Sequence, residues 1–173
     1  MTTSPRVRTD MPGRRTVRRA ALVLLALLPL AAGAAPQVDE HGFVRADPAQ
    51  IEWKIQPNGV RNAILYGDPA KPGLYVVRSV FPPGIMSAPH FHTQDRIVAV
   101  IQGTWYTGTD DRWDPDGTQA LGPGSYMVHP KGQVHFDGAK DEEVIVQITG
   151  MGPVRTVFSH PDQPHMGHPH KMK

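Results

Sequence analysis

The 173-residue chain contains no cysteine, and its longest apolar run is too short for a membrane span of ordinary length. Without cysteine, the protein can form neither disulfide bonds nor thiolate metal sites. Strong helical periodicity is also missing from residues 38–159, so no long helix is expected there. A middle region of this size can still bury a single core without covalent staples.

The first 34 residues have the layout of a secretory signal peptide. They contain six arginines and one acidic residue, followed by a short apolar run that includes Pro29. Residues 32–34 fit the small-x-small cleavage rule, so the mature chain is expected to start at Ala35 and to be exported, periplasmic or secreted. An uncleaved membrane anchor is the alternative. Two pairs of adjacent arginines leave both the twin-arginine and the general export route open.

Removal of the signal peptide reverses the sign of the net charge. The full chain has 18 basic and 16 acidic residues, whereas the chain after residue 34 keeps 12 basic and 15 acidic residues. The basic character therefore belongs to the export signal, and nucleic-acid binding is not expected.

Residues 36–159 are predicted to form one all-β domain. Proline, glycine and aspartate separate short runs that are rich in strand-forming residues. These runs are Ile51–Ile55, Ala63–Tyr66, Leu74–Phe81, Arg96–Ile101, Thr104–Thr107, Ser125–His129, Glu143–Ile148 and Val154–Phe158. About eight short strands indicate a sandwich or barrel, and a closed double-sheet jelly roll leaves no exposed sheet edges.

Two segments are expected to lie outside this sheet structure. Residues 160–173 contain four histidines and three prolines without apolar periodicity, which predicts a disordered His/Met-rich tail. Copper or nickel capture by this tail is the alternative to a merely solvated one. The acidic insert at residues 109–118 resembles a calcium loop but lacks its terminal glutamate, so a solvated hairpin loop is expected.

Three histidines form the candidate metal site. His90 and His92 are two residues apart, which places both imidazoles on one face of a strand. His135 follows a Pro-x-Gly turn that begins at Pro130 and supplies a third imidazole. Imidazole suits Fe, Mn, Ni, Cu, Zn and Co, so the residues alone do not select one divalent transition metal.

The same two stretches resemble the two motifs of the cupin superfamily. Residues 84–103 follow Gly-x5-His-x-His-x3-Glu-x6-Gly except at Arg96, and residues 124–139 follow Gly-x5-Pro-x-Gly-x2-His-x3-Asn except at Ala139. The flanking sequences resemble a group of small exported bacterial cupins. The resemblance implies a double-stranded β-helix, or jelly-roll barrel, with a metal held by His90, His92 and His135.

Arg96 stands where the cupin motif usually has a glutamate ligand. If one extended strand runs from His90 through Arg96, the guanidinium faces the cavity with the histidines. Arginine does not ligate metals, so the site becomes a three-histidine centre with open coordination positions and a cation for an anionic substrate. The alternative is that Arg96 turns away and pairs with an acid such as Asp95 or Asp137.

Tyr106 and His129 are two other side chains near the motifs that could reach the site. Tyr106 is a candidate catalytic residue, because it shares the inward parity of the ligand strand if the turn at Gly103 keeps register. Trp105 then belongs to the core or to a subunit contact. His129 matches no cupin ligand position, so a packing or rim role is expected rather than a fourth imidazole.

The resemblance and the three-histidine site together predict a non-haem metal-dependent enzyme. Some cupins without the glutamate, including thiol and β-diketone dioxygenases, use such a centre, which implies a dioxygenase-like reaction with Fe(II) on a small anionic or enolisable substrate. A lyase or isomerase is compatible with the same site. The alternative is a non-catalytic exported module that binds a metal or small ligand. A homodimer with Trp53, Trp105 or the strand at Leu74 in its interface is a further expectation by analogy.

Overall fold

The computed structural model describes Met1 and residues 37–172, so the predicted signal peptide lies outside the described region apart from its first residue. Within the described residues the protein consists of strands joined by turns and two short 3-10 helices, Pro48–Gln50 and Pro115–Gly117. No helix in this part of the chain is long and apolar enough to cross a membrane.

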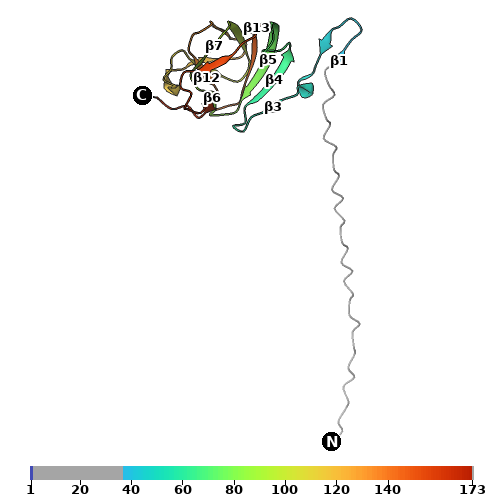
Figure 1. Cartoon of the computed structure of the whole chain (residues 1–173). Coiled ribbons are helices and arrows are strands. Elements are labelled where there is room, and N and C mark those ends of the chain that lie inside the picture. Colours follow the sequence, from blue (N-terminus) through green and yellow to red (C-terminus); the bar gives the residue numbers. More distant parts are fainter. Residues whose placement is uncertain (2–36, 173) are drawn as a thin grey trace. The chain divides into compact units, whose positions relative to one another are not determined.

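The larger sheet has six antiparallel strands in the order β11-β8-β13-β5-β4-β3. Their bounds are Tyr126–His129, Arg96–Gln102, Val144–Gly152, Gly73–Phe81, Arg61–Tyr66 and Lys54–Ile55. The two long central strands, β13 and β5, pair over nine residues from Val144↔Phe81 to Gly152↔Gly73. This ladder is the longest strand pairing in the described part of the barrel. Figure 1 shows β4 beside β5.

The smaller sheet has five antiparallel strands in the order β10-β9-β12-β6-β15. Their bounds are Gln119–Leu121, Trp105–Gly108, Phe136–Gly138, Met86–Ser87 and Met166–Gly167. Two further pairs complete the described strands: β7 (His90–His92) with β14 (Thr156–Phe158), and β1 (Gln37–Val38) with β2 (Val44–Arg45).

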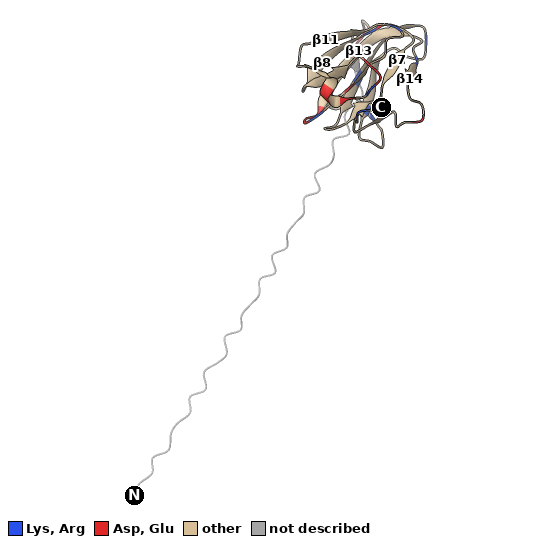
Figure 2. Cartoon of the chain, turned by 90° about the vertical axis from the view of Figure 1, so that its left-hand side faces the viewer, with Lys and Arg blue, Asp and Glu red and all other residues tan. Residues whose placement is uncertain are grey.

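Alternating side chains from both sheets build the larger of two apolar clusters. On β8, Val98 and Val100 are buried while Ile97 and Ile101 are exposed, which is the pattern of a strand with one face inward. Valines of β13 and Trp105 of β9 join the same apolar cluster. Strands β7, β11, β13 and β14 carry no charged residue, and in Figure 2 charge gathers mainly in the connecting loops.

All eight runs predicted from the sequence contain a strand, and the all-β jelly-roll prediction is confirmed. The sequence did not indicate the short strands β6, β10, β12 and β15, because two or three residues are too few to show a period of two. Trp105 is 1% exposed, so it belongs to the core and does not line a subunit interface.

The expectation of a disordered tail is wrong for residues 160–172. Met166 and Gly167 extend the smaller sheet by pairing with β6, and the His165 ring stacks on Phe158 with centroids 3.8 Å apart. Main-chain pairing and aromatic stacking supply the order that apolar periodicity does not. We therefore call residues 160–172 the C-terminal strap.

The acidic insert is also more than a solvated hairpin. Trp113 within it is 1% exposed and lies against His170 of the strap, with ring centroids 5.1 Å apart. Lys171 forms a 3.1 Å ion pair with Asp114, and the Met172 amide donates to the Arg112 carbonyl over 2.7 Å. The insert and the strap thus hold each other against the barrel.

Candidate metal centre

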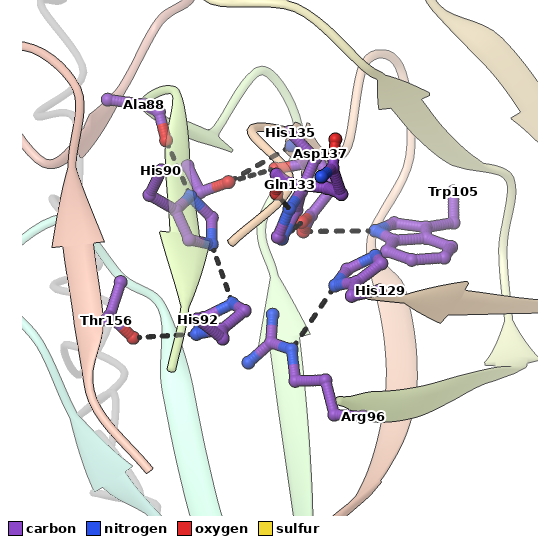
Figure 3. A network of polar contacts seen from close by, with 11 residues as sticks. Ala88, His90, His92, Arg96, Trp105, His129, Gln133, His135, Asp137 and Thr156 are labelled. Atoms are coloured by element: carbon purple, nitrogen blue, oxygen red, sulfur yellow. Dashed lines mark hydrogen bonds and ion pairs between the residues drawn. The ribbon is translucent and has the colours of Figure 1, made fainter. Parts of the chain in front are cut away.

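Strand pairing brings the three predicted histidines together. His90 and His92 occupy the two ends of β7 and both are buried. The main chain of His135 pairs with that of His90 through two hydrogen bonds of 2.9 Å, so the two residues face each other across an isolated bridge. This bridge places the third imidazole beside the His-x-His pair (Figure 3).

The three imidazoles offer ligand atoms that all lie within 4.8 Å of one another. Nε2 of His90 and Nε2 of His92 are 3.1 Å apart. Two nitrogens that each bind one ion at about 2.1 Å are separated by about 3.0 Å at a right angle and about 3.4 Å at a tetrahedral angle. The observed separation fits two ligands of a common metal ion.

Hydrogen bonds fix which ring nitrogen of each histidine is free. Nδ1 of His90 lies 2.7 Å from the Ala88 carbonyl, and Nδ1 of His135 lies 3.0 Å from the Gln133 carbonyl. Each Nδ1 therefore carries the proton and donates it, which leaves a lone pair on Nε2. Nε2 of His135 is buried without a hydrogen-bond partner, so the donor set fits a metal.

The electrostatics of the site favour neutral imidazoles. Burial, helped by His135, lowers the pKa of His90 to about 4. Burial also lowers the pKa of His92, His129 and His135. Protons therefore do not compete for these nitrogens at neutral pH, which is the state that a metal requires.

Arg96 lines the same cavity as His90 and His92. Residues 93–95 interrupt the strand, so the inward direction of Arg96 comes from its own strand, β8, rather than from continuous parity with His90. Its Nε–H donates a 3.2 Å hydrogen bond to Nδ1 of His129, which lies opposite on β11. Arg96 forms no ion pair with any acid among residues 37–172, so the outward alternative is not observed.

Tyr106 does not reach the site, and the geometric basis for its predicted catalytic role is absent. Strand β9 turns Trp105 and Thr107 inward, so Tyr106 lies on the opposite face. Its ring there packs beside an apolar cluster and lies 4.4 Å from Nζ of Lys140. The inward and outward positions of the ligand strand therefore do not continue with the same parity past the turn at Gly103.

Two further residues lie at the site: His129, for which a packing or rim role was expected, and Asp137, which was expected only as a possible partner of Arg96. His129 is 1% exposed, and its ring centroid lies 3.8 Å from that of His135. Asp137 is 4% exposed, accepts a 3.3 Å hydrogen bond from Trp105 Nε1 through Oδ1, and has no partner for Oδ2. The signal for Asp137 was available, because it stands two residues after His135 and so shares its strand face.

The site opens onto a cavity of about 720 Å³, a size suited to a small organic ligand. Its polar wall contains His90, His92, Arg96 and Asp137. The rest of the lining consists of apolar side chains of both sheets, several uncharged polar side chains, and the strap residues His165 and Met166. A guanidinium therefore lies in the same chamber as two of the three imidazoles.

Residues 70–163, which contain the three imidazoles, Arg96 and Asp137, match the family model described as Cupin. The chain belongs to the cupin family. Among curated cupin relatives, germin-like protein subfamily 3 member 2 of Arabidopsis thaliana is 35% identical over 65 residues, or 37% of this chain and 29% of the relative. Germin-like protein 4-1 of Oryza sativa subsp. japonica is 32% identical over 90 residues, or 47% and 35%. The matched part of this cupin is thus only about a third of the length of these relatives.

Solved cupin-like structures share the fold at low sequence identity. A polyketide cyclase from Streptomyces resistomycificus has a TM-score of 0.55 at 20% identity, over 68% of this chain and 87% of that one. A DMSP lyase from Ruegeria pomeroyi has a TM-score of 0.54 at 19% identity, over 67% and 64%. At these identities the likeness establishes the architecture alone.

Proposed function

We propose that this cupin is an exported metal-dependent enzyme that acts on a small anionic, enolisable substrate through dioxygenase-like chemistry. The observation that carries the proposal is the convergence of three buried imidazoles, two of which line a cavity that Arg96 also lines. Perturbed titratable groups that meet in a deep cavity are typical of catalytic sites.

His90, His92 and His135 would hold the metal through their Nε2 atoms, with Fe(II) as the first candidate and Mn, Ni, Cu and Zn as others. When bound, a divalent metal supplies a Lewis acid for a substrate oxygen and, as Fe(II), electrons for oxygen chemistry. Thr156 Oγ1, 3.2 Å from Nδ1 of His92, helps to orient that ring, as the carbonyls of Ala88 and Gln133 orient the other two.

Arg96 would bind the anionic end of the substrate. The bond to His129 uses the Nε–H group and anchors the guanidinium, whereas its terminal nitrogens form no hydrogen bond with any residue of the described region. Those nitrogens can bind a carboxylate or enolate oxygen with charge-assisted hydrogen bonds. Because the surroundings are largely apolar, this attraction is stronger than it would be in water.

Oxygen uptake tests this function directly. Purified protein loaded with Fe(II) should consume oxygen with one class of a panel of β-diketones, thiols and catechols, and His135→Ala should abolish that consumption. If no compound of the panel causes oxygen consumption but one of them binds tightly, the result would support a non-catalytic ligand-binding module instead.

A lyase or isomerase reaction that does not consume oxygen is the second candidate function, and Asp137 favours it. A buried carboxylate with one free oxygen, in the cavity of a Lewis-acid metal, suits a lyase or isomerase that removes a proton next to a carbonyl. The same panel, incubated under nitrogen and assayed for products by mass spectrometry, separates this reaction from the oxygen-dependent one.

A further inference from the structure

We propose that Asp137 selects substrates that carry a protonated oxygen next to their anionic group, as in a 2-hydroxy acid or an enol acid. This inference rests on the proposed function, because it assigns the substrate class of the same cavity. Arg96 would take the anionic group and Asp137 the hydroxyl proton. The two side chains line one cavity but are not paired with each other.

The backbone and one oxygen of Asp137 are fixed. Its amide donates to Ser87 Oγ over 3.0 Å, and Ser87 Oγ donates back to its carbonyl over 3.2 Å. Trp105 Nε1 donates to Oδ1 over 3.3 Å. These contacts hold the carboxylate in one orientation and leave Oδ2 as its only free acceptor.

Oδ2 of Asp137 receives no hydrogen bond from any residue of the described region. A buried carboxylate oxygen without a hydrogen bond is costly. Nε2 of His135 lies 4.0 Å from Oδ2 and presents a lone pair, because the ring proton of His135 is on Nδ1. A ring nitrogen of His129 lies within 4.8 Å of the carboxylate, but it forms no hydrogen bond with Asp137. The geometry therefore favours a proton that arrives with the ligand.

This arrangement discriminates between ligands of equal charge. A hydroxyl group gives Oδ2 of Asp137 a charge-assisted hydrogen bond, whereas an ether oxygen in the same place turns lone pairs toward the carboxylate. A hydrogen bond to a charged group contributes roughly 1.5–3 kcal/mol, which corresponds to a factor of about ten or more in affinity.

Binding of two matched probes to the Co(II)-loaded protein tests the inference without any turnover. Glycolate carries a hydroxyl beside its carboxylate, and methoxyacetate is its methyl ether. Titration calorimetry and the visible spectrum of Co(II) should show glycolate bound at least about tenfold more tightly. In Asp137→Asn the preference should fall below about twofold, with unchanged Co(II) stoichiometry. The extra bulk of the methoxy group is the same for that variant, so a fall in the preference reports the loss of the negatively charged acceptor.

Asp141→Asn is the matched control, because it makes the same chemical change at an exposed position outside the cavity and should keep the tenfold preference. If Asp137→Asn does not fold, Trp105→Phe replaces it, since loss of the indole donor frees the carboxylate to rotate and should also lower the preference.

Three results would overturn the inference: equal binding of both probes to the wild type, an unchanged preference in Asp137→Asn, or loss of Co(II) from Asp137→Asn. Loss of Co(II) would show that Asp137 coordinates the metal and does not select the substrate. A wild type that binds no Co(II) at all would instead defeat the proposed function, and the substrate assignment would fall with it.

Discussion

Arg96 and His129 lie opposite each other on β8 and β11, and the Nε–H group of Arg96 donates a 3.2 Å hydrogen bond to Nδ1 of His129. A neutral imidazole has one ring proton, so a ring that accepts at Nδ1 carries its proton on Nε2. Nε2 of His129 is then a donor and not a metal ligand. Arg96 thus replaces the usual cupin carboxylate and also keeps a fourth imidazole out of the ligand set.

Substitution of Arg96 should separate anion binding from metal binding. Arg96→Ala is expected to weaken glycolate binding to the Co(II)-loaded protein by roughly 1.5–3 kcal/mol, the contribution of a hydrogen bond to a charged group, with little loss of metal. Arg96→Glu should restore a carboxylate ligand and tighten metal binding while it lowers anion affinity. Titration calorimetry measures both constants, and an Arg96→Ala variant with wild-type glycolate affinity would contradict the assigned role.

Loss of one imidazole should remove the metal and leave the barrel. His135→Ala deletes a nitrogen that has no other partner, so the variant should lose stoichiometric metal by elemental analysis while its circular dichroism stays that of a β protein. Deletion of residues 160–173 is the control for binding by the histidines of the strap. Metal that stays in His135→Ala but leaves the deletion variant would place the ion in the strap.

The metal-free protein should become less stable as the pH falls. The pKa of His90 in the fold is about 4, whereas an unfolded chain has the ordinary value near 6.5, so the unfolded state binds more protons between these values. The contribution of neutral His90 to the free energy of unfolding is complete above about pH 6.5. It is lost progressively as the pH falls from there to about 4, and roughly 2 kcal/mol is lost at pH 5. Urea unfolding at pH 7.5 and pH 5 measures the difference, and His90→Asn should show a shallower pH dependence.

Substitution of Trp113 should destabilise the protein more than most substitutions outside the metal site. Its indole is buried between the insert and the strap, so Trp113→Ala is expected to cost about 3–5 kcal/mol of unfolding free energy. Trp53→Ala is the control, because Trp53 is only half-buried and its ring faces the Arg61 guanidinium at 5.6 Å. Equal losses from the two variants in urea unfolding would show that the insert does not depend on Trp113.

Export should leave a defined N-terminus. Intact-mass spectrometry of the protein from the periplasmic or secreted fraction should give a chain that starts at or near Ala35. A soluble exported protein that retains Met1 would rule out the signal-peptide prediction.

The strands and the three-histidine cluster could be predicted because they depend on local rules. Alternating side chains and a His-x-His pair need only the period of a strand, so β8 and the positions of His90 and His92 follow from the sequence. Arg96 was expected to face inward for a partly mistaken reason. The strand does not run through residues 93–95, and the pairing of β8 with β11 sets the direction of this side chain.

The missed features depend on contacts between distant segments. His129 enters the site because β11 pairs with β8, and Tyr106 turns away because the register changes after Gly103. The strap is ordered through β6 and Trp113, which are far from it in the sequence, and through Phe158, which lies just before it. No periodic pattern within residues 160–173 contains this information.

The place of the strap sets the order in which the site is completed. Met166 and His165 line the cavity, and they follow His135 by 30 residues or more. During synthesis both histidine motifs therefore leave the ribosome before this part of the wall does. The imidazoles come together in a chamber that is still open on one side, and the pairing of Met166 with β6 closes that side last.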